Sequence, residues 1–210
     1  MKFKSINNFF WILKNKRSIK NWKKRNFSAP SPEIVKHHVL INNNLDNSLW
    51  IETGTYYGET TKLLSKISKK TISIEADEKL YNLVKKKLGH LTNVEIVFGK
   101  SEDILDEIIK SNLEYNNICI YLDAHLCQDH LRNIKTFGSE DKATPIKFEL
   151  NCISKYINNF KNIVVLIDDI RLFKNNFQNY PDKNDIVDWC KKNNFLWDIE
   201  QDIFICKKND

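Results

Sequence analysis

Residues 48–77 read SLWIETGTYYGETTKLLSKISKKTISIEAD, and this stretch decides the fold. Two short apolar runs flank a turn that contains two glycines and a segment with leucine and isoleucine at helical spacing. We therefore expect a strand, a turn, a helix and a second strand that ends at Glu75. In open α/β sheets the ligand binds outside the carboxyl ends of the strands. An acid about 20 residues past the turn can accept hydrogen bonds there from both ribose hydroxyls.

The turn itself differs from the pattern that binds dinucleotides. Gly54 and Gly58 are separated by three residues, and Tyr56 stands where a pyrophosphate binder needs its middle glycine. Glu52, just before the turn, would repel a pyrophosphate but could hold an ammonium group, directly or through water. A ligand with an adenosine and an amino acid, and without phosphate, fits both features. S-adenosylmethionine is such a ligand.

The segments ETGTYYGETT and IEAD resemble the first two motifs of class I S-adenosylmethionine-dependent methyltransferases. The resemblance implies an α/β, Rossmann-like fold whose seven-stranded sheet is mostly parallel, with an antiparallel C-terminal hairpin and helices on both faces. It also implies that the segment GKSE after the third strand contacts adenine. The candidate cofactor-binding residues are Glu52, Thr53, Gly54, Thr55, Tyr56, Gly58, Thr60, Glu75, Ala76, Ser101, Glu102 and Asp123. The simpler alternatives are that Gly58 only lets a helix pack on a strand and that Ser101 only caps a helix.

Acidic side chains follow two later strands. Residues 118–122 and 163–167 are continuous apolar runs, which are typical of buried central strands in a parallel sheet. Asp123 follows the first run, and Asp168 and Asp169 follow the second, so we expect the three carboxylates to meet at one edge. Such a cluster needs a cation or a proton to offset its repulsion. The three aspartates therefore form a candidate site for Mg²⁺ or a similar divalent cation.

This arrangement is similar to metal-dependent O-methyltransferases that act on catechols and on antibiotic sugars. The segments SAPSP (28–32) and LIDDIRLF (166–173) also resemble uncharacterised bacterial methyltransferases associated with surface glycans. The resemblance implies methyl transfer to a hydroxyl, with a small molecule or a glycan as acceptor. Asp123 and His125 are the catalytic candidates, and His125 is either the base or a further ligand of the cation. Catechol-type enzymes place a lysine slightly further on than His125. The alternative is that Asp168 and Asp169 only cap a turn and pair with Arg171, and that His125 only bonds the neighbouring loop.

Between these two strands the pattern predicts a loop and a helix. Residues 126–144 form a long polar stretch of the kind that makes lids or binding loops. Pro145 starts a helix with Phe148, Leu150 and Ile153 at its apolar positions. We expect these three side chains to pack on the sheet.

The charge is unevenly distributed along the chain. The net charge is +6, but residues 1–27 hold nine basic residues and no acid, so the remainder carries −3. We therefore divide the chain into a basic amphipathic arm (1–27) and a methyltransferase domain (28–210). We expect the arm to pack on the domain or to cover the substrate, and the alternative is contact with an anionic membrane surface or another polyanion. The acidic domain disfavours nucleic acid as a partner.

The remaining composition bounds the setting. The 210 residues suit one domain, and no stretch is long enough to span a bilayer. The five cysteines lack metal-ligand spacing and are odd in number, which favours a reducing compartment and therefore the cytoplasm, with the inner membrane surface as the alternative. The rival to a methyltransferase is a non-catalytic module that binds an adenosyl ligand, or a membrane or polyanion, on the same fold.

Overall fold

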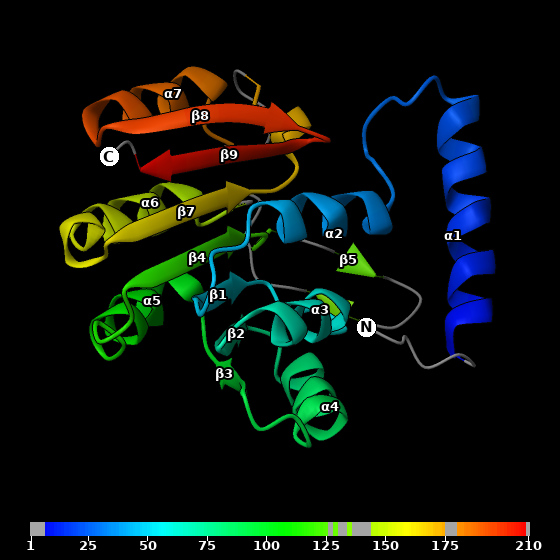
Figure 1. The fold of residues 1–210 in the computed structure, drawn as a ribbon, viewed down its shortest axis with the longest axis horizontal. Coiled ribbons are helices and arrows are strands. Elements are labelled where there is room, and N and C mark those ends of the chain that lie inside the picture. Colours follow the sequence, from blue (N-terminus) through cyan, green and yellow to red (C-terminus); the bar gives the residue numbers. More distant parts are fainter. Residues whose placement is uncertain (1–6, 126–127, 130–133, 136–143, 175–179, 209–210) are drawn as a thin grey trace.

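The structure, a computed structural model, describes residues 7–125, 128–129, 134–135, 144–174 and 180–208. A sheet of seven strands forms its centre (Figure 1). These strands are β1 (Leu49–Thr53), β2 (Lys70–Glu75), β3 (Val94–Phe98), β4 (Asn117–Leu122), β7 (Asn162–Ile167), β8 (Phe195–Glu200) and β9 (Ile203–Lys208). Their order is β3-β2-β1-β4-β7-β9-β8, and β9 is antiparallel to β7 and β8 while the other pairs are parallel. The predicted sheet with its antiparallel C-terminal hairpin is confirmed.

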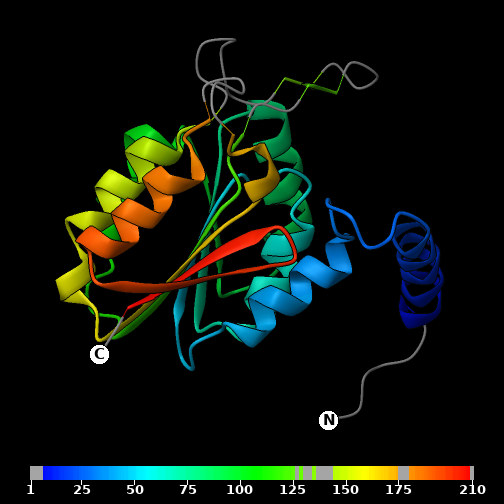
Figure 2. The same cartoon turned by 90° about the horizontal axis from the view of Figure 1, so that it is seen from above.

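Helices cover both faces of this sheet, as predicted (Figure 2). The helices are α1 (Asn7–Lys24), α2 (Glu33–Asn42), α3 (Glu59–Ile67), α4 (Glu78–Leu88), α5 (Ser101–Lys110), α6 (Ile146–Ser154) and α7 (Lys183–Lys192). One face carries α2, α3 and α4, and the other carries α5, α6 and α7. A separate two-stranded ladder joins β5 (Gln128–Asp129) to β6 (Ile134–Lys135). Most of the predicted loop at 126–144 lies outside the described residues.

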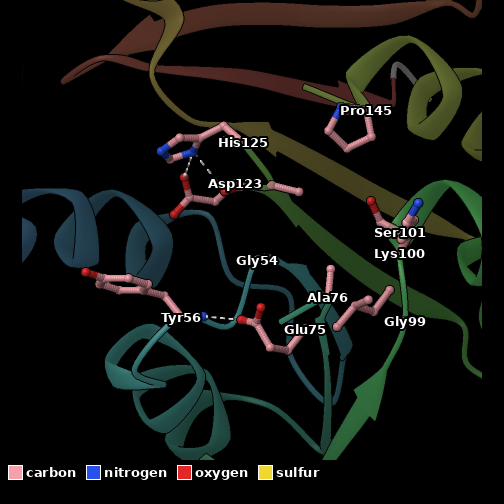
Figure 3. A pocket seen from close by; sticks show the side chains of 12 residues that line it. Gly54, Tyr56, Glu75, Ala76, Gly99, Lys100, Ser101, Asp123, His125 and Pro145 are labelled. Atoms are coloured by element: carbon pink, nitrogen blue, oxygen red, sulfur yellow. Dashed lines mark hydrogen bonds and ion pairs between the residues drawn. The ribbon is translucent and has the colours of Figure 1, made fainter. Parts of the chain in front are cut away.

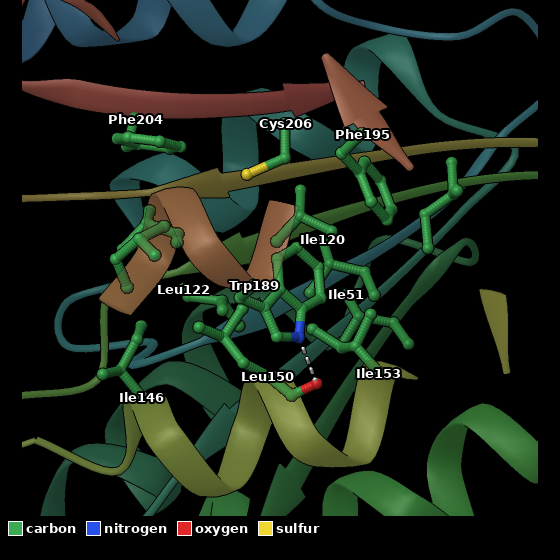
Figure 4. Close-up of a cluster of buried hydrophobic side chains, with 14 of the residues drawn as sticks. Ile51, Ile120, Leu122, Ile146, Leu150, Ile153, Trp189, Phe195, Phe204 and Cys206 are labelled. Carbon is green, nitrogen blue, oxygen red and sulfur yellow. Dashed lines mark hydrogen bonds between the residues drawn. The ribbon is translucent and has the colours of Figure 1, made fainter. Parts of the chain in front are cut away.

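Strand alternation decides which side chains reach which face. Ile51 of β1 belongs to the apolar cluster under α5, α6 and α7, whereas Trp50 belongs to the cluster under α2 and α3. Thr53 therefore shares the face of Ile51, and Glu52 shares the face of Trp50. Figure 4 shows the larger cluster, in which Trp189 of α7 donates its indole hydrogen to the Leu150 carbonyl at 3.1 Å.

The helix after Pro145 packs differently from the prediction in one respect. Leu150 and Ile153 are buried as expected, but Phe148 is 56% exposed and Glu149 is 0% exposed. Ile146, Leu150 and Ile153 repeat at intervals of four and three residues, and this row leaves Phe148 on the outer side of the helix. The prediction for Phe148 was wrong because Ile146 is the first member of the buried row.

The parallel strands end level with one another. Thr53 lies beside Ile74 of β2 and Leu122 of β4 in the register of the sheet. The Asp123 amide donates to the Thr53 carbonyl at 3.0 Å, and the Asp168 amide donates to the Leu122 carbonyl at 3.0 Å. The residues that follow β2, β4 and β7 are therefore held at one edge of the sheet.

Helix α1 lies to one side of the domain, and both views show it apart from the sheet (Figures 1 and 2). Trp22 is its buried side chain among residues 15–24, and its indole donates to the Ser28 carbonyl at 2.9 Å. Phe27 contacts the same ring edge-on at 5.0 Å. Within the ranges that the structure describes, no helix has the length and apolar character needed to cross a membrane. Contact of the arm with a membrane surface stays a prediction.

Candidate cofactor and substrate site

A cavity of about 220 Å³ opens at the carboxyl edge of the parallel strands (Figure 3). Seven of the residues that line it were predicted from the sequence, namely Gly54, Tyr56, Glu75, Ala76, Ser101, Asp123 and His125. The others are Ile74, Gly99, Lys100, Ala124 and Pro145. Asp123 and His125 lie toward one end of the cavity, and Gly99 and Ser101 lie toward the other. The prediction that the ends of β1, β2, β3 and β4 build one site is consistent with this lining.

Glu75 at the end of β2 is oriented by two backbone amides. The Tyr56 amide donates to Oε2 at 2.8 Å, and the Asp77 amide donates to Oε1 at 2.9 Å. Burial raises the pKa of Glu75, and these two hydrogen bonds oppose that effect. Each carboxylate oxygen has a second lone pair. Glu75 is therefore held in place with acceptor capacity for the two hydroxyls of a ribose.

The two glycines of the turn have different roles. A Cβ added to Gly54 would lie 2.7 Å from the Asp123 carbonyl oxygen, so the turn can approach β4 only without a side chain. A Cβ added to Gly58 would lie 2.8 Å from a methyl carbon of Val84 in α4. Both glycines also have positive φ angles, +88° and +72°. Gly58 thus serves helix packing, which was the simpler alternative for it, and Gly54 shapes the cavity wall.

Glu52 lies beneath the turn, outside the cavity lining. Its Oε2 accepts hydrogen bonds from Thr61 at 2.5 Å and from Ser73 at 2.6 Å, and its side chain is buried. Burial raises the pKa of Glu52 to about 8, although the two hydroxyls oppose the shift. Thr55 bonds to the same Ser73 hydroxyl at 2.6 Å, and Thr60 also lies outside the lining. Direct contact of Glu52 with a cofactor ammonium group stays a prediction.

The predicted acidic cluster is present, and it includes a lysine that sequence patterns do not reveal. Lys36 of α2 donates to Asp168 and to Asp169, at 2.7 Å in each case. Burial opposes the charge of Lys36, but the two aspartates outweigh burial and raise its pKa to about 12. The Tyr121 hydroxyl donates to Asp168 at 2.5 Å. Lys36 precedes Asp168 by 132 residues, and a single lysine in a helix gives no sign of such a partner.

Asp169 also forms an ion pair with Arg171, which the simpler alternative for residues 168–171 predicted. Arg171 bridges from Asp169 to Asp202 in the turn between β8 and β9. Burial would raise the pKa of Asp169, but Lys36 and Arg171 hold it below its ordinary value. The carboxylate is therefore charged at neutral pH and is compensated by two cations of the protein.

Three side chains fit a divalent cation, and they differ from the predicted set by one residue. Asp123, His125 and Asp169 each offer one ligand atom, and these atoms lie within 4.8 Å of one another. Asp168 is absent from this group, and its oxygens accept from Lys36, Tyr121 and the Asp169 amide. One imidazole and two carboxylates are suitable ligands for a divalent metal. The residues fit such an ion, with His125 in the place predicted for Asp168.

The surroundings of His125 favour its protonated form when no cation is bound. Burial opposes its charge, but the hydrogen bond and the charge of Asp123 raise the pKa of His125 to about 9. Its Nδ1 lies 3.5 Å from the Asp123 carboxylate. At neutral pH the ring therefore holds a proton and cannot accept another.

A second, smaller cavity adjoins the first. Its wall includes Asp169, Phe173 and Tyr180, and it shares Asp123 and His125 with the larger cavity. The rings of Phe173 and Tyr180 are in edge contact, with centroids 5.3 Å apart. At about 10 Å³ this cavity has room for one water-sized group, such as a single hydroxyl, which would lie beside Asp123 and His125.

No family model and no curated protein matches the chain in sequence. Solved structures do match it. A putative methyltransferase from Streptococcus mutans, in complex with SAH, is 15% identical and covers 86% of this chain and 98% of its own, with a TM-score of 0.52. The N-methyltransferase NodS from Bradyrhizobium japonicum is 9% identical and covers 82% of this chain and 92% of its own, with a TM-score of 0.50. A putative rRNA methylase from Clostridium thermocellum is 12% identical and covers 82% of this chain and 93% of its own, with a TM-score of 0.50.

The chain has the class I methyltransferase fold. Its cavity lies at the carboxyl ends of β1, β2 and β3, the edge where open α/β sheets bind their ligands. The three matched proteins are described by different acceptors or by none. The function of this chain must therefore be argued from its own residues.

Proposed function

We propose that the protein transfers a methyl group from S-adenosylmethionine to a hydroxyl group, with a divalent cation assisting. The observation that carries this proposal is the pair of adjoining cavities that share Asp123 and His125. One cavity has the features of an adenosyl site, and the other adjoins it beside the candidate cation ligands. Methyl transfer by in-line displacement requires alignment of donor and acceptor and removal of the acceptor's proton.

The donor side follows from the order of the strands. Glu75 at the end of β2 takes the ribose hydroxyls, which fixes the middle of the ligand. The purine then extends toward Ser101 after β3, and the methionine part extends toward Gly54 and Asp123, after β1 and β4. This orientation places the sulfonium near the two residues that also line the second cavity.

The proton of the acceptor hydroxyl goes to Asp123. His125 already holds a proton at neutral pH, so Asp123 is the group at the junction that can accept one. His125 stabilises the Asp123 carboxylate across their 3.5 Å ion pair. A divalent cation held by Asp123, Asp169 and an unprotonated His125 would take the place of the His125 proton, supply Lewis acidity and lower the pKa of a bound hydroxyl.

The substrate class that we propose is a sugar hydroxyl of a surface glycan. This part of the proposal rests on the resemblance to metal-dependent O-methyltransferases and glycan-associated methyltransferases. The net charge of −3 on residues 28–210 also makes a polyanionic acceptor unfavourable at this site. A non-catalytic module with the same fold would bind the adenosyl ligand equally well without Asp123.

Calorimetric titration with S-adenosylhomocysteine is the first test. We expect binding by the wild type, a 10- to 100-fold loss of affinity in Glu75→Gln, and no change in the control Glu78→Gln. Glu78 is a matched acid that is exposed in the first turn of α4 and lies outside the cavity lining. A folded wild type that does not bind the ligand would refute the proposed cofactor.

Transfer of labelled methyl groups to monosaccharides and catechols, with Mg²⁺ or with a chelator, tests the reaction. We expect Asp123→Asn to lower the rate about 10²- to 10⁴-fold. Binding without transfer to any hydroxyl acceptor, in both the wild type and Asp123→Asn, would favour the non-catalytic module. Transfer that is equal with Mg²⁺ and chelator would remove the cation from the proposal.

A further inference from the structure

Buried oxygens without partners gather behind one wall of the cofactor cavity. Within the described part of the chain, four buried side-chain oxygens lack a hydrogen bond, and they belong to Thr53, Glu102 and Glu149. Both carboxyl oxygens of Glu149 are in this set, and the side chain is 0% exposed. Buried polar groups without partners are rare because each costs the free energy of its lost hydration. The cluster therefore calls for a specific explanation.

Glu149 lies directly behind residues that line the cavity. It belongs to α6, whose preceding residue Pro145 is part of the cavity wall. The hydroxyls of Ser101 and Thr53 are close enough to act on the pKa of Glu149 as hydrogen-bonding groups, and Ser101 also lines the cavity. Burial raises the pKa of Glu149 to about 7, and these two hydroxyls oppose the shift. Neither hydroxyl makes a hydrogen bond of ordinary geometry to the carboxyl group in the structure.

A purely structural role explains this side chain poorly. Leu150 and Ile153 of the same helix fill the apolar core around it. An apolar side chain of similar length would pack there without the cost of an unpaired carboxyl group. A role of Glu149 in the cavity, on the other side of Ser101, explains the acid better.

Ser101 lies at the end of the cavity that the purine would occupy. A serine hydroxyl has one hydrogen to donate and two lone pairs that accept. Above its pKa of about 7, Glu149 is a carboxylate, which only accepts, so a hydrogen bond between the two then runs from Ser101 to Glu149. Once the hydrogen points toward Glu149, the lone pairs of Ser101 remain for the cavity. A 6-amino group can donate to those lone pairs, whereas a 6-oxo group would meet them as a second acceptor.

We propose that Glu149 is a positioning residue that orients the Ser101 hydroxyl as an acceptor, and that the cavity thereby selects a 6-aminopurine over a 6-oxopurine. The inference rests on the proposed adenosyl cofactor and adds how its base is recognised. Ligand binding draws Ser101 and Thr53 into hydrogen bonds with Glu149. Glu149 acts through Ser101 and does not touch the ligand.

The test compares two ligands that differ only at this position of the purine. S-adenosylhomocysteine and its deaminated analogue, S-inosylhomocysteine, are titrated calorimetrically at pH 8.5, where Glu149 is mostly ionised, into the wild type, Glu149→Met and Ser101→Ala. We expect the wild type to prefer the amino ligand by about 10- to 100-fold. In Glu149→Met the Ser101 hydrogen is free to turn into the cavity, so the preference should fall to about threefold or less. Ser101→Ala should lose the preference as well.

The control is Glu78→Gln, which changes an exposed acid in the first turn of α4, outside the cavity lining. This variant should keep the wild-type preference. A structural role of Glu149 would weaken both ligands equally and leave their ratio unchanged, so an unchanged ratio in folded Glu149→Met overturns the inference. If that variant does not fold, an unchanged ratio in Ser101→Ala overturns it. A folded wild type that binds neither ligand refutes the proposed function itself, which is a distinguishable result.

Discussion

Two buried glutamates on opposite faces of the sheet differ in how their carboxyl groups are satisfied. Glu52 faces α3 and accepts hydrogen bonds from Thr61 at 2.5 Å and Ser73 at 2.6 Å. Glu149 reaches the other face from α6 and has no hydrogen bond among the described residues. Burial raises the pKa of both, to about 8 and about 7. Burial alone therefore does not distinguish a structural acid from one that acts with a ligand. The hydrogen-bond partners of the carboxyl group distinguish the two.

The difference originates in adjacent residues of one strand. Glu52 and Thr53 end β1 and point to opposite faces. On the face of Glu52, Ser73 of β2 and Thr61 of α3 supply hydroxyls at close range. On the opposite face, the hydroxyl of Thr53 lacks a hydrogen-bond partner, as the Glu149 carboxyl group does. The first network is closed in the protein alone, and we propose that the second closes when the cavity is filled.

The largest effect that we expect from this pair is a loss of stability as pH rises. The folded-state pKa of each acid lies above the ordinary 4.5, so the folded state binds more protons than the unfolded state between the two values. Stability is therefore greatest below pH 4.5 for these groups and falls as pH rises through about 7 and about 8. At roughly 1.4 kcal/mol per pKa unit, Glu52 accounts for about 5 kcal/mol and Glu149 for about 3 kcal/mol.

Urea denaturation at intervals between pH 5 and pH 9 measures this dependence. Glu52→Gln and Glu149→Met should each flatten the profile, Glu52→Gln the more strongly. His125, with a pKa of about 9, acts in the same direction above its ordinary 6.5, so the variants are needed to isolate the two acids. A wild-type profile that is flat or rises over this range would contradict the assignment of both groups.

Truncation should separate the two acids at pH 5.5, where both are mainly neutral. Glu52→Ala removes the acceptor of two buried hydroxyls and leaves a cavity beneath the turn, so we expect a loss of about 3–4 kcal/mol in the free energy of unfolding. Glu149→Ala leaves a cavity but no orphaned hydrogen bond, and its loss should be smaller by about 1–2 kcal/mol. Equal losses in urea denaturation would show that the two environments are equivalent.

The sequence predicts this fold well because its signals are local. The glycine turn, the continuous apolar strands and Glu75 at a strand end need only neighbouring residues to be read, and the structure has them in the predicted places. Ser101 also lines the cavity, at the position that the resemblance assigns to adenine contact. These features lie at the ends of strands, and the local sequence pattern is enough to locate a strand end.

The site partners depend instead on contacts between distant segments. Lys36 meets Asp168 across 132 residues of chain, and no periodicity marks that pair. Glu149 had a signal, since it lies three residues after Ile146 and four before Ile153, within the buried row of α6. An acid inside an apolar row is a sign of a special role. Assigning Phe148 to that row concealed it.

Replacing the unpaired acid by an apolar side chain should stabilise the protein at pH 8.5. At this pH the buried carboxyl group of Glu149 is mostly ionised and unpaired, and Glu149→Met removes it. Methionine has a similar length to glutamate and retains most of the packing. We expect a gain of about 1–2 kcal/mol in urea denaturation, with ligand affinity lowered for the amino ligand. Glu52→Met, as the matched change, should destabilise at pH 5.5, because it removes the acceptor of the Thr61 and Ser73 hydroxyls. A destabilised Glu149→Met at pH 8.5 would show that the carboxyl group has partners in solution.

The smallest and most specific contrast lies in two threonines, one on each network. Thr61→Val removes a donor to Glu52, so we expect a loss of about 1–2 kcal/mol, or roughly 2–8 °C in Tm for a protein of this size. Thr53→Val replaces a buried hydroxyl that has no hydrogen bond, so its effect should stay within about 0.5 kcal/mol. Saturating S-adenosylhomocysteine sharpens the contrast, because the second network then forms and Thr53→Val should show a smaller ligand-induced rise in Tm than the wild type. Thr61→Val should keep the full rise. If Thr53→Val keeps it too, the Thr53 hydroxyl takes no part in the network that the ligand completes.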